Sequence, residues 1–306
     1  MSDIEWTDKS WNPFVGCSPK PNSPACDHCY AILETRRKHT SHKSFSDVTV
    51  NKKGVKWTGK INRGSDDMVN KPLNTNDKCI FFVCSLSDFF HKNATDDLRL
   101  EAMDIIAQCP QHTFQILTKR PENINPFLKR TNTRFPDNVW VGATVENLAT
   151  MVERIPLLLE VDCVLRFLSI EPLLEDLGDI PHEGLHWLIV GGESGRGKRR
   201  PMKADWVRRV QTQAKEADIP FFFKQWGKPG NNPIATTTPA GEKIEDWVQI
   251  MDPYSNLSMK NKDRLGSEAN KRTHKAKGGA LLDGKLCQEM PSKKLLAVLK
   301  ASRHYK

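Results

Sequence analysis

The sequence lacks the features that mark membrane, secreted and repeat proteins. No apolar run approaches the roughly 18 residues of a membrane-spanning helix, and the first residues do not place a basic region before an apolar one, as a signal peptide does. No internal repeat is present, and the glycines form no Walker or Rossmann pattern. We therefore expect a cytoplasmic protein that has no membrane partner.

The composition indicates one large folded core. Of the 306 residues 38% are apolar, including eight Trp and thirteen Phe, and a single α/β barrel uses a chain of this length. The net charge is +9, with basic stretches at 196–200 and 260–277 and an acidic one at 171–185. An excess of positive charge favours a polyanionic partner such as a nucleotide or nucleic acid, although a charge run can also be a solvated face.

The apolar pattern predicts an α/β protein with a parallel sheet. Six short runs are continuously apolar rather than alternating, which is typical of strands buried on both faces. Helical patterns at 96–108, 147–160 and 203–216 lie between them and indicate right-handed βαβ units. We expect a partial or complete (β/α) barrel, with a doubly wound open sheet as the alternative. The predicted strands are 79–84, 114–118, 138–144, 164–170, 186–191 and 220–224.

The chain is expected to have two parts. Residues 1–226 would form the barrel domain, with an irregular insertion at 32–78, where apolar residues are few and Trp57 is the anchor. Residues 227–306 begin with a stretch rich in Gly, Pro, Asn and Thr and would form an elaboration packed on the barrel. A short helix is predicted near 291–301.

Three of the eight cysteines, Cys17, Cys26 and Cys29, are clustered. Structural zinc sites need four ligands and usually two CxxC pairs, whereas only one pair is present here. A zinc-stabilised nucleic-acid-binding protein would have to use His28, which lies inside the CxxC, or the distant Cys84 as fourth ligand. On an iron–sulfur cube, three thiolates leave one iron free to bind another molecule.

The stretch from Cys17 to Ala31 resembles a lengthened form of the radical S-adenosylmethionine (SAM) signature, in which three cysteines hold a [4Fe-4S] cluster and an aromatic residue, here Tyr30, follows the last. Ten ordered blocks also resemble a phage and bacterial family of unknown function that is described as radical-SAM-like. The blocks are WNPFVGC, CDHCYA, FFVCSLSDFFH, ILTKRPE, VWVGATVEN, RFLSIEPLL, LIVGGESG, RPM, FFFKQWG and LLDG.

The resemblance implies a barrel with the cluster loop after a first strand near 11–15, the metal ligands Cys17, Cys26 and Cys29, and the cofactors [4Fe-4S] and SAM. It implies reductive cleavage of SAM to a 5′-deoxyadenosyl radical, and the positive charge favours a nucleotide or nucleic-acid-related substrate. An electron donor is an expected partner. The family is also associated with a partner protein that carries its own three-cysteine motif, so a cluster-bearing accessory subunit without SAM cleavage is a further alternative.

Two features depart from the common radical SAM pattern. The first gap in the cysteine motif is eight residues instead of three, and the tripeptide Gly191-Gly192-Glu193 follows a late strand instead of the second. The second-strand position holds the segment that ends at Asp88. Either Asp88 or Glu193 could bind the amino group of SAM, while the two glycines would let the backbone approach a ligand closely.

Polar residues follow all six predicted strands, where catalytic groups of barrel enzymes lie. By their chemistry, Lys119 or Arg120 suits the SAM carboxylate and Glu146 or Asn147 suits the ribose. Cys84 and Lys119 are the candidate catalytic residues, Cys84 as a hydrogen donor. For any of these residues a helix cap or an interior ion pair is the alternative. The strand-end residues are Ser87, Asp88, His91, Thr118, Lys119, Arg120, Thr144, Glu146, Asn147, Ser169, Glu171, Glu193, Ser194, Lys224 and Gln225.

Overall fold

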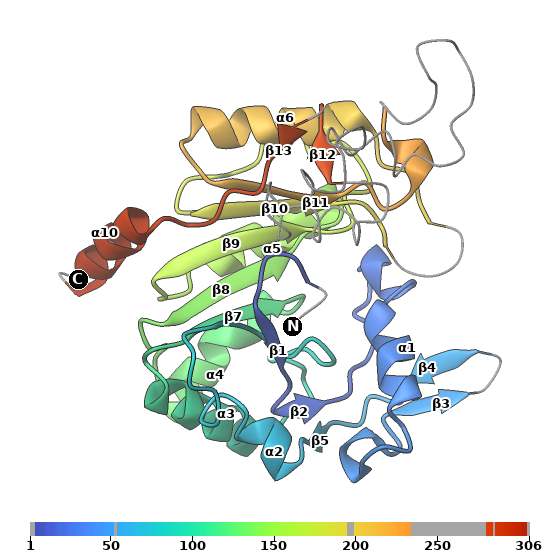
Figure 1. The fold of residues 1–306 in the computed structure, drawn as a ribbon, viewed down its shortest axis with the longest axis vertical. Helices are drawn as coiled ribbons and strands as arrows, with labels where there is room; N and C mark the ends of the chain where they lie inside the picture. The colour runs from blue at the N-terminus through green and yellow to red at the C-terminus, as the bar shows by residue number, and fades with distance from the viewer. Residues whose placement is uncertain (1–3, 52–53, 195–198, 234–279, 284, 305–306) are drawn as a thin grey trace, which may run out of the picture.

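The computed structural model has a seven-stranded parallel sheet that curls into a half-barrel (Figure 1). The strand order is β1-β6-β7-β8-β9-β10-β11, with every neighbouring pair parallel, which confirms the predicted α/β class and the partial barrel. The structure describes residues 4–51, 54–194, 199–233, 280–283 and 285–304. The strands are β1 (Lys9–Trp11), β6 (Ile80–Val83), β7 (Thr113–Thr118), β8 (Val139–Thr144), β9 (Leu165–Ile170), β10 (Trp187–Gly191) and β11 (Phe221–Gln225).

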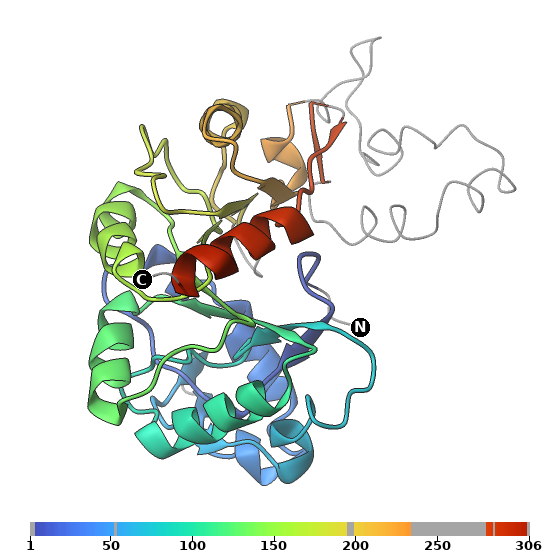
Figure 2. The same ribbon diagram turned by 90° about the vertical axis from the view of Figure 1, so that its left-hand side faces the viewer.

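Both faces of the sheet are buried, which explains the continuous apolar runs. One face packs against the connecting helices in the largest apolar cluster, and the other carries a second cluster centred on Trp187. Leu296 and Leu299 of the C-terminal helix pack against this second cluster, and Figure 2 shows that helix crossing in front of the sheet. The helices are α3 (Asp96–Gln108), α4 (Ile124–Thr131), α5 (Leu148–Leu159), α6 (Ala204–Glu216) and α10 (Lys293–His304).

Helix α4 is the connecting helix that the sequence pattern did not predict. It is eight residues long and has Pro126 in its first turn, where the missing backbone N–H has no intrahelical partner to lose. It ends at Asn132, which adopts a left-handed conformation with φ of 51°. Its apolar residues Ile124 and Phe127 are buried against the sheet.

The predicted insertion at 32–78 contains short regular elements. The strands β3 and β4 form a hairpin, and β5 pairs with β2 next to the cysteine loop. A small apolar cluster that includes Phe45 and Leu86 joins these elements to α1, and Trp57 packs against it. The elements of the insertion are α2 (Asp66–Val69), β3 (Thr49–Asn51), β4 (Val55–Trp57), β5 (Asn62–Arg63) and the 3₁₀ turn η2 (Lys43–Phe45), and α1 (Tyr30–Arg37) overlaps its start. Outside the insertion lie β2 (Phe14–Val15) and the 3₁₀ turns η1 (Pro24–Cys26), η3 (Pro121–Asn123) and η4 (Pro229–Asn231).

The C-terminal part is described at 227–233, 280–283 and 285–304, so the basic stretch at 260–277 lies outside the described residues. A two-stranded ribbon, β12 (Leu281–Leu282) and β13 (Lys285–Leu286), precedes α10, which confirms the helix predicted there. The predicted boundary at residue 226 stays a prediction. Among the helices of the described residues, none has the length and apolar character needed to cross a membrane.

Candidate functional site

A cavity of about 190 Å³ lies at the C-terminal ends of the sheet strands. Because parallel strands end at the same edge of a sheet, residues that are far apart in the sequence meet there. Of the fifteen polar strand-end residues, all but His91, Glu146, Asn147 and Gln225 line this cavity. Cys17, Cys26 and Cys29 line it as well, so the cysteine cluster and the strand ends belong to one site.

The cysteine loop is fixed to the sheet at its first residue. Gly16 has a φ of 107°, and a Cβ there would lie 2.1 Å from the Lys60 carbonyl oxygen, so only glycine fits. Cys17 follows it directly, Cys26 ends η1, and Cys29 is the N-cap residue of α1. All three thiols are free. The loop therefore presents to the cavity three thiols that form no disulfide.

Buried thiols and one buried lysine set the electrostatics of the cavity. Burial, with smaller contributions from Asp88 and the other thiols, raises the pKa of Cys17 to about 12, and burial also raises the pKa of Cys29. Burial opposes the charge of Lys119, yet Glu146 and the thiols Cys26 and Cys29 raise its pKa. Among the described residues, the Lys119 ammonium makes no hydrogen bond or ion pair, and it is the cation placed to compensate thiolates.

Within the described ranges, no three His, Cys, Asp or Glu side chains form a group that could hold one metal ion. A cubane cluster takes each thiolate on a different iron, so its cysteines do not have to share an ion. The donor set of three thiols beside an unpaired lysine matches that kind of group. Cys17, Cys26 and Cys29 are the residues that would hold it.

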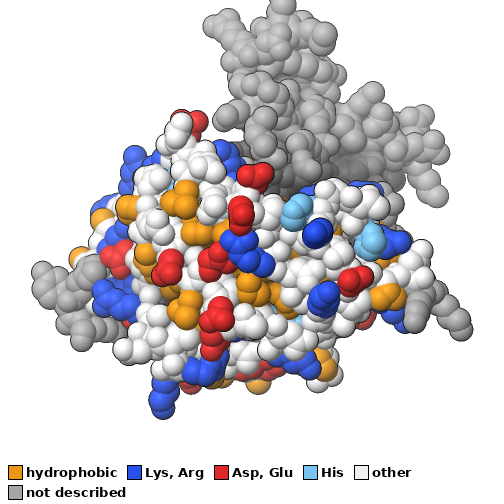
Figure 3. All heavy atoms as spheres, turned by 90° about the horizontal axis from the view of Figure 1, so that it is seen from below, with side chains coloured by type: hydrophobic (Ala, Val, Ile, Leu, Met, Phe, Trp, Pro, Cys, Tyr) orange, Lys and Arg blue, Asp and Glu red, His pale blue; other side chains and the backbone are white. Residues whose placement is uncertain are grey.

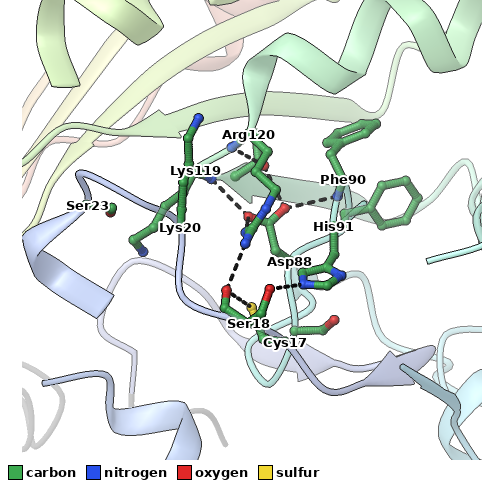
Figure 4. A network of polar contacts seen from close by, with 12 residues as sticks. Cys17, Ser18, Lys20, Ser23, Asp88, Phe90, His91, Lys119 and Arg120 are labelled. Carbon is green, nitrogen blue, oxygen red and sulfur yellow. Dashed lines mark hydrogen bonds and ion pairs between the residues drawn. The ribbon is translucent and has the colours of Figure 1, made fainter. Parts of the chain in front are cut away.

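Asp88 is saturated by hydrogen bonds from the protein. Its carboxylate is buried and ion-paired with Arg120 at 3.0 Å, and although burial opposes ionisation, Arg120 and the other donors lower its pKa. A carboxylate offers about four acceptor sites, and four donors fill them here (Figure 4). This arrangement favours a positioning role over contact with the SAM amino group. The donors are the Phe90 N–H, the Thr118 hydroxyl, the Lys119 N–H and the Arg120 guanidinium, at 3.0, 2.6, 3.1 and 3.0 Å.

Arg120 and His91 hold Ser18, the residue after Cys17. Arg120 donates to the Ser18 carbonyl at 2.7 Å, and His91 Nε2 lies 2.7 Å from the Ser18 hydroxyl (Figure 4). The Asn93 N–H donates to His91 Nδ1, so the His91 proton is on Nε2 and points to Ser18. Burial lowers the pKa of His91 to about 4, which keeps the ring neutral. The SDFFH segment, together with Arg120, therefore holds the cysteine loop in place.

Glu193 ties the other end of the cysteine loop to the sheet. Its carboxylate accepts from the Arg200 backbone N–H at 2.8 Å and lies 3.0 Å from His28 Nδ1. Although burial opposes ionisation, Arg200 and His28 lower its pKa to about 2. Arg200 also donates to the Pro24 carbonyl at 2.8 Å. Glu193 therefore lines the cavity with its carboxylate committed to Arg200 and to the His28 of the CxxC.

Glu146 and Asn147 do not line the cavity. They have the alternative roles of a residue in an interior ion pair and a helix cap. The fully buried Glu146 accepts from the Ser23 hydroxyl at 2.6 Å and pairs with Arg154 at 3.1 Å. Asn147 is the N-cap of α5 and forms a capping box with Thr150. The ribose role predicted for this pair has no support from their geometry.

The glycines of the GGE tripeptide serve close packing. A Cβ on Gly191 would lie 2.7 Å from Glu171 Oε1, and one on Gly192 would lie 2.2 Å from the Trp226 carbonyl oxygen. Gly192 lines the cavity, whereas Gly191 does not. The backbone contact requires glycine at Gly192 whether or not a cofactor is bound, whereas at Gly191 the neighbour is the flexible end of the Glu171 side chain.

The remaining predicted residues line the cavity, and they differ in how far hydrogen bonds and ion pairs within the protein already occupy them. The Ser87 hydroxyl donates to the Gly16 carbonyl at 2.6 Å and so supports the loop. Glu171 pairs with Lys224 at 3.0 Å and accepts a long hydrogen bond from Ser169 at 3.4 Å, which leaves part of its acceptor capacity open. Cys84 is buried, and burial raises its pKa well above the usual value, so the thiol keeps its hydrogen.

Sequence reasoning did not single out Ser18, Ser23, Arg154 and Arg200. For Arg154 a signal existed, because it lies on the same helical stripe as the buried Met151 and Leu158, and a charge on an apolar stripe indicates a buried ion pair. Arg200 lies in the RPM block, but nothing in that block indicates a carboxylate partner.

Comparison with known proteins places this chain in a family. The family model described as "Protein of unknown function (DUF5131)" matches residues 1–291. The chain belongs to this family. Comparison of this DUF5131 sequence with curated proteins gives no match.

Solved structures of spore photoproduct lyase resemble this DUF5131 chain weakly. A double mutant with bound AdoMet and dinucleoside spore photoproduct has a TM-score of 0.34 at 10% identity. The match covers 68% of this chain and 61% of that one. A single mutant has a TM-score of 0.33 at 12% identity, with the same coverage of both chains. The chain thus spans about three fifths of the length of these structures.

Proposed function

We propose that this protein is a radical SAM-type iron–sulfur enzyme that acts on a nucleotide or a nucleic-acid-related substrate. The observation that carries the proposal is the meeting of Cys17, Cys26 and Cys29 with the unpaired Lys119 in one cavity at the C-terminal edge of a half-barrel. Three thiols without a fourth protein ligand leave a coordination position for a chelating cofactor.

Each part of the chemistry has a source. When bound, a [4Fe-4S] cluster would supply one electron from an external donor protein, which breaks the sulfur–C5′ bond of SAM and gives methionine and a 5′-deoxyadenosyl radical. The substrate would supply the hydrogen atom of the 5′-deoxyadenosine that this chemistry releases. The residues of the chain bind and orient SAM and exclude water from the cavity.

The residues assigned to SAM are those that can still form a hydrogen bond or an ion pair with a ligand. Lys119 pairs with its carboxylate, since this buried ammonium makes no direct ion pair with a described carboxylate, although Glu146 and the cysteine thiols raise its pKa. Glu171 accepts from its amino group or ribose hydroxyls, because Asp88 and Glu193 are committed to protein donors. Cys84 stays the candidate hydrogen donor, and the three-cysteine-motif partner protein stays a prediction.

Anaerobic reconstitution with iron and sulfide tests the proposal. We expect about four irons per chain, as one cubane requires, and an electron spin resonance signal that changes when SAM is added. Cys26→Ala should lose the cluster, whereas Cys287→Ala, which removes a free thiol outside the cavity, should keep it.

Two outcomes would support other functions. A colourless protein with one zinc would overturn the proposal in favour of a zinc-stabilised nucleic-acid-binding protein. A cluster whose spectrum ignores SAM would favour an accessory subunit.

A further inference from the structure

A groove of about 1000 Å³ opens beside the cavity, on the side where the half-barrel is not closed. Its walls include Lys9 and Ser10 of β1 and Lys224 and Gln225 of β11, the two edge strands of the sheet (Figure 1). A ligand in the groove can therefore reach the cavity without crossing the sheet. The residues that line both spaces are Ile4, Tyr30, Ser85, Ser194 and Lys224.

Besides Lys224, which pairs with Glu171, three lysines from separate elements line this groove: Lys9 on β1, Lys38 at the end of α1, and Lys71 after α2. None of them forms an ion pair with a carboxylate of the described residues, and Lys71 donates one hydrogen bond to the Ser10 carbonyl at 2.6 Å. Partial burial, together with Lys9 and Lys38, lowers the pKa of Lys71, so the three charges lie close enough to repel one another.

The acidic residues that line the groove, Glu5 and Glu34, act on cations other than these three lysines. Glu34 is paired with Arg37, and Glu5 acts on Lys224. The cluster of Lys9, Lys38 and Lys71 thus keeps its positive charge. On the face shown in Figure 3, Lys and Arg side chains are interspersed with Asp and Glu. The uncompensated charge is a property of the groove and does not simply follow from the net charge of +9.

Tyr30 stands where the groove meets the cavity. It directly follows the ligand candidate Cys29, and 46% of it is exposed although it is aromatic. Its hydroxyl donates to the Ser85 carbonyl at 3.1 Å, which fixes the ring. A fixed, exposed ring beside a basic groove is the combination that binds single strands, by stacking one base while cations follow the backbone.

We infer that this groove binds the phosphodiester backbone of a single-stranded nucleic acid through Lys9, Lys38 and Lys71 and places one nucleotide at Tyr30, above the cavity. The inference rests on the proposed function and names its substrate class. A single strand is preferred over a duplex because chemistry on a nucleotide needs it outside the base stack. The lysines read no sequence, so the affinity should depend little on base order.

Fluorescence anisotropy of a labelled single-stranded oligonucleotide, titrated at several salt concentrations, tests the inference. In Lys9→Gln/Lys38→Gln/Lys71→Gln the slope of log K against log salt should fall by about 2, at about 0.7 per lost phosphate contact. If the intercept at 1 M salt is unchanged, this slope corresponds to about a hundredfold loss of affinity at 0.1 M salt. Folding of each variant is checked by circular dichroism.

A matched variant separates the groove from net charge. Lys129→Gln/Lys215→Gln/Lys294→Gln removes the same three charges from exposed positions on α4, α6 and α10 and should bind nearly as the parent does. Equal losses in both triple variants, or no binding by the parent at low salt, would overturn the inference.

Tyr30 gives a second readout. Tyr30→Phe keeps the ring and should bind as the parent does, whereas Tyr30→Leu should lose about five- to 150-fold, the range for one stacked base. Equal binding by both variants would remove Tyr30 from the site.

The binding assay needs neither cluster nor SAM. Groove-dependent binding without SAM cleavage would therefore contradict the proposed function alone, and SAM cleavage without such binding would contradict this inference alone.

Discussion

Asp88→Asn should destabilise the protein strongly, although it changes one oxygen to nitrogen. The side-chain oxygen that remains can still accept from the Thr118 hydroxyl and the Phe90 N–H. The new amide then turns its own hydrogens toward the Lys119 N–H and the Arg120 guanidinium, which donated to the lost oxygen. Two donor–donor contacts and an unpaired buried guanidinium result.

The size of the effect follows from burial. Arg120 and Asp88 are 7% and 8% exposed, and breaking such a buried pair from one side lowers the free energy of unfolding by about 3–5 kcal/mol. Asp47→Asn is the matched control, because Asp47 pairs with Lys60 at 3.6 Å where both side chains are more than half exposed. That change should lower the free energy of unfolding by about 0–1 kcal/mol.

Urea unfolding followed by tryptophan fluorescence measures both variants. The midpoint of Asp88→Asn should fall well below that of Asp47→Asn at neutral pH. Equal midpoints would refute the claim that Asp88 is committed to Arg120, which holds the residue after Cys17, and the Asp88 carboxylate would again be available for a cofactor.

Three further predictions concern the same loop and its supports. Gly192→Ala should lower the free energy of unfolding by about 1–3 kcal/mol in thermal or urea unfolding, because its Cβ would overlap the Trp226 carbonyl, and an unchanged midpoint would contradict this. Glu193→Gln should reduce the iron bound after reconstitution, since it removes the charge that holds Arg200 and His28, and full occupancy would contradict that role. His91 is neutral in the folded state with a pKa of about 4, below the 6.5 of the free side chain, so its contribution is present above pH 6.5 and lost as the pH falls toward 4. Between pH 7 and 5 the parent should lose about 1–2 kcal/mol more than His91→Asn does, and parallel losses would contradict the assignment.

Six strands of the sheet were predictable because they are buried on both faces, whereas β1 lies at Lys9–Trp11 and not at the first strand expected near 11–15, where Phe14–Val15 pairs with β5 instead. The run at 138–144 differs from β8 by one residue, and the predicted helix at 96–108 matches α3, which begins after the capping residue Thr95. Helix α4 was not predicted because its first turn contains Asn and Pro, and tertiary packing stabilises it. In the insertion, short elements share one small cluster, and local periodicity does not reveal such cooperation.

The convergence of the site was also predictable, since parallel strands end at one edge. The protein partners of each carboxylate were not predictable. Glu146 is bonded to Ser23, which is 123 positions away, and Glu193 to His28 across the mouth of the half-barrel. A sequence names the acids at strand ends, but the donors that occupy them come from distant segments and appear only when the chain is folded.

The most direct test of the proposed function is the formation of 5′-deoxyadenosine. Reconstituted protein is incubated anaerobically with SAM and a chemical reductant, and the products are separated by chromatography. We predict 5′-deoxyadenosine that requires both reductant and SAM and is absent with Cys26→Ala. A protein that holds its full cluster and forms no 5′-deoxyadenosine under reducing conditions would contradict the account.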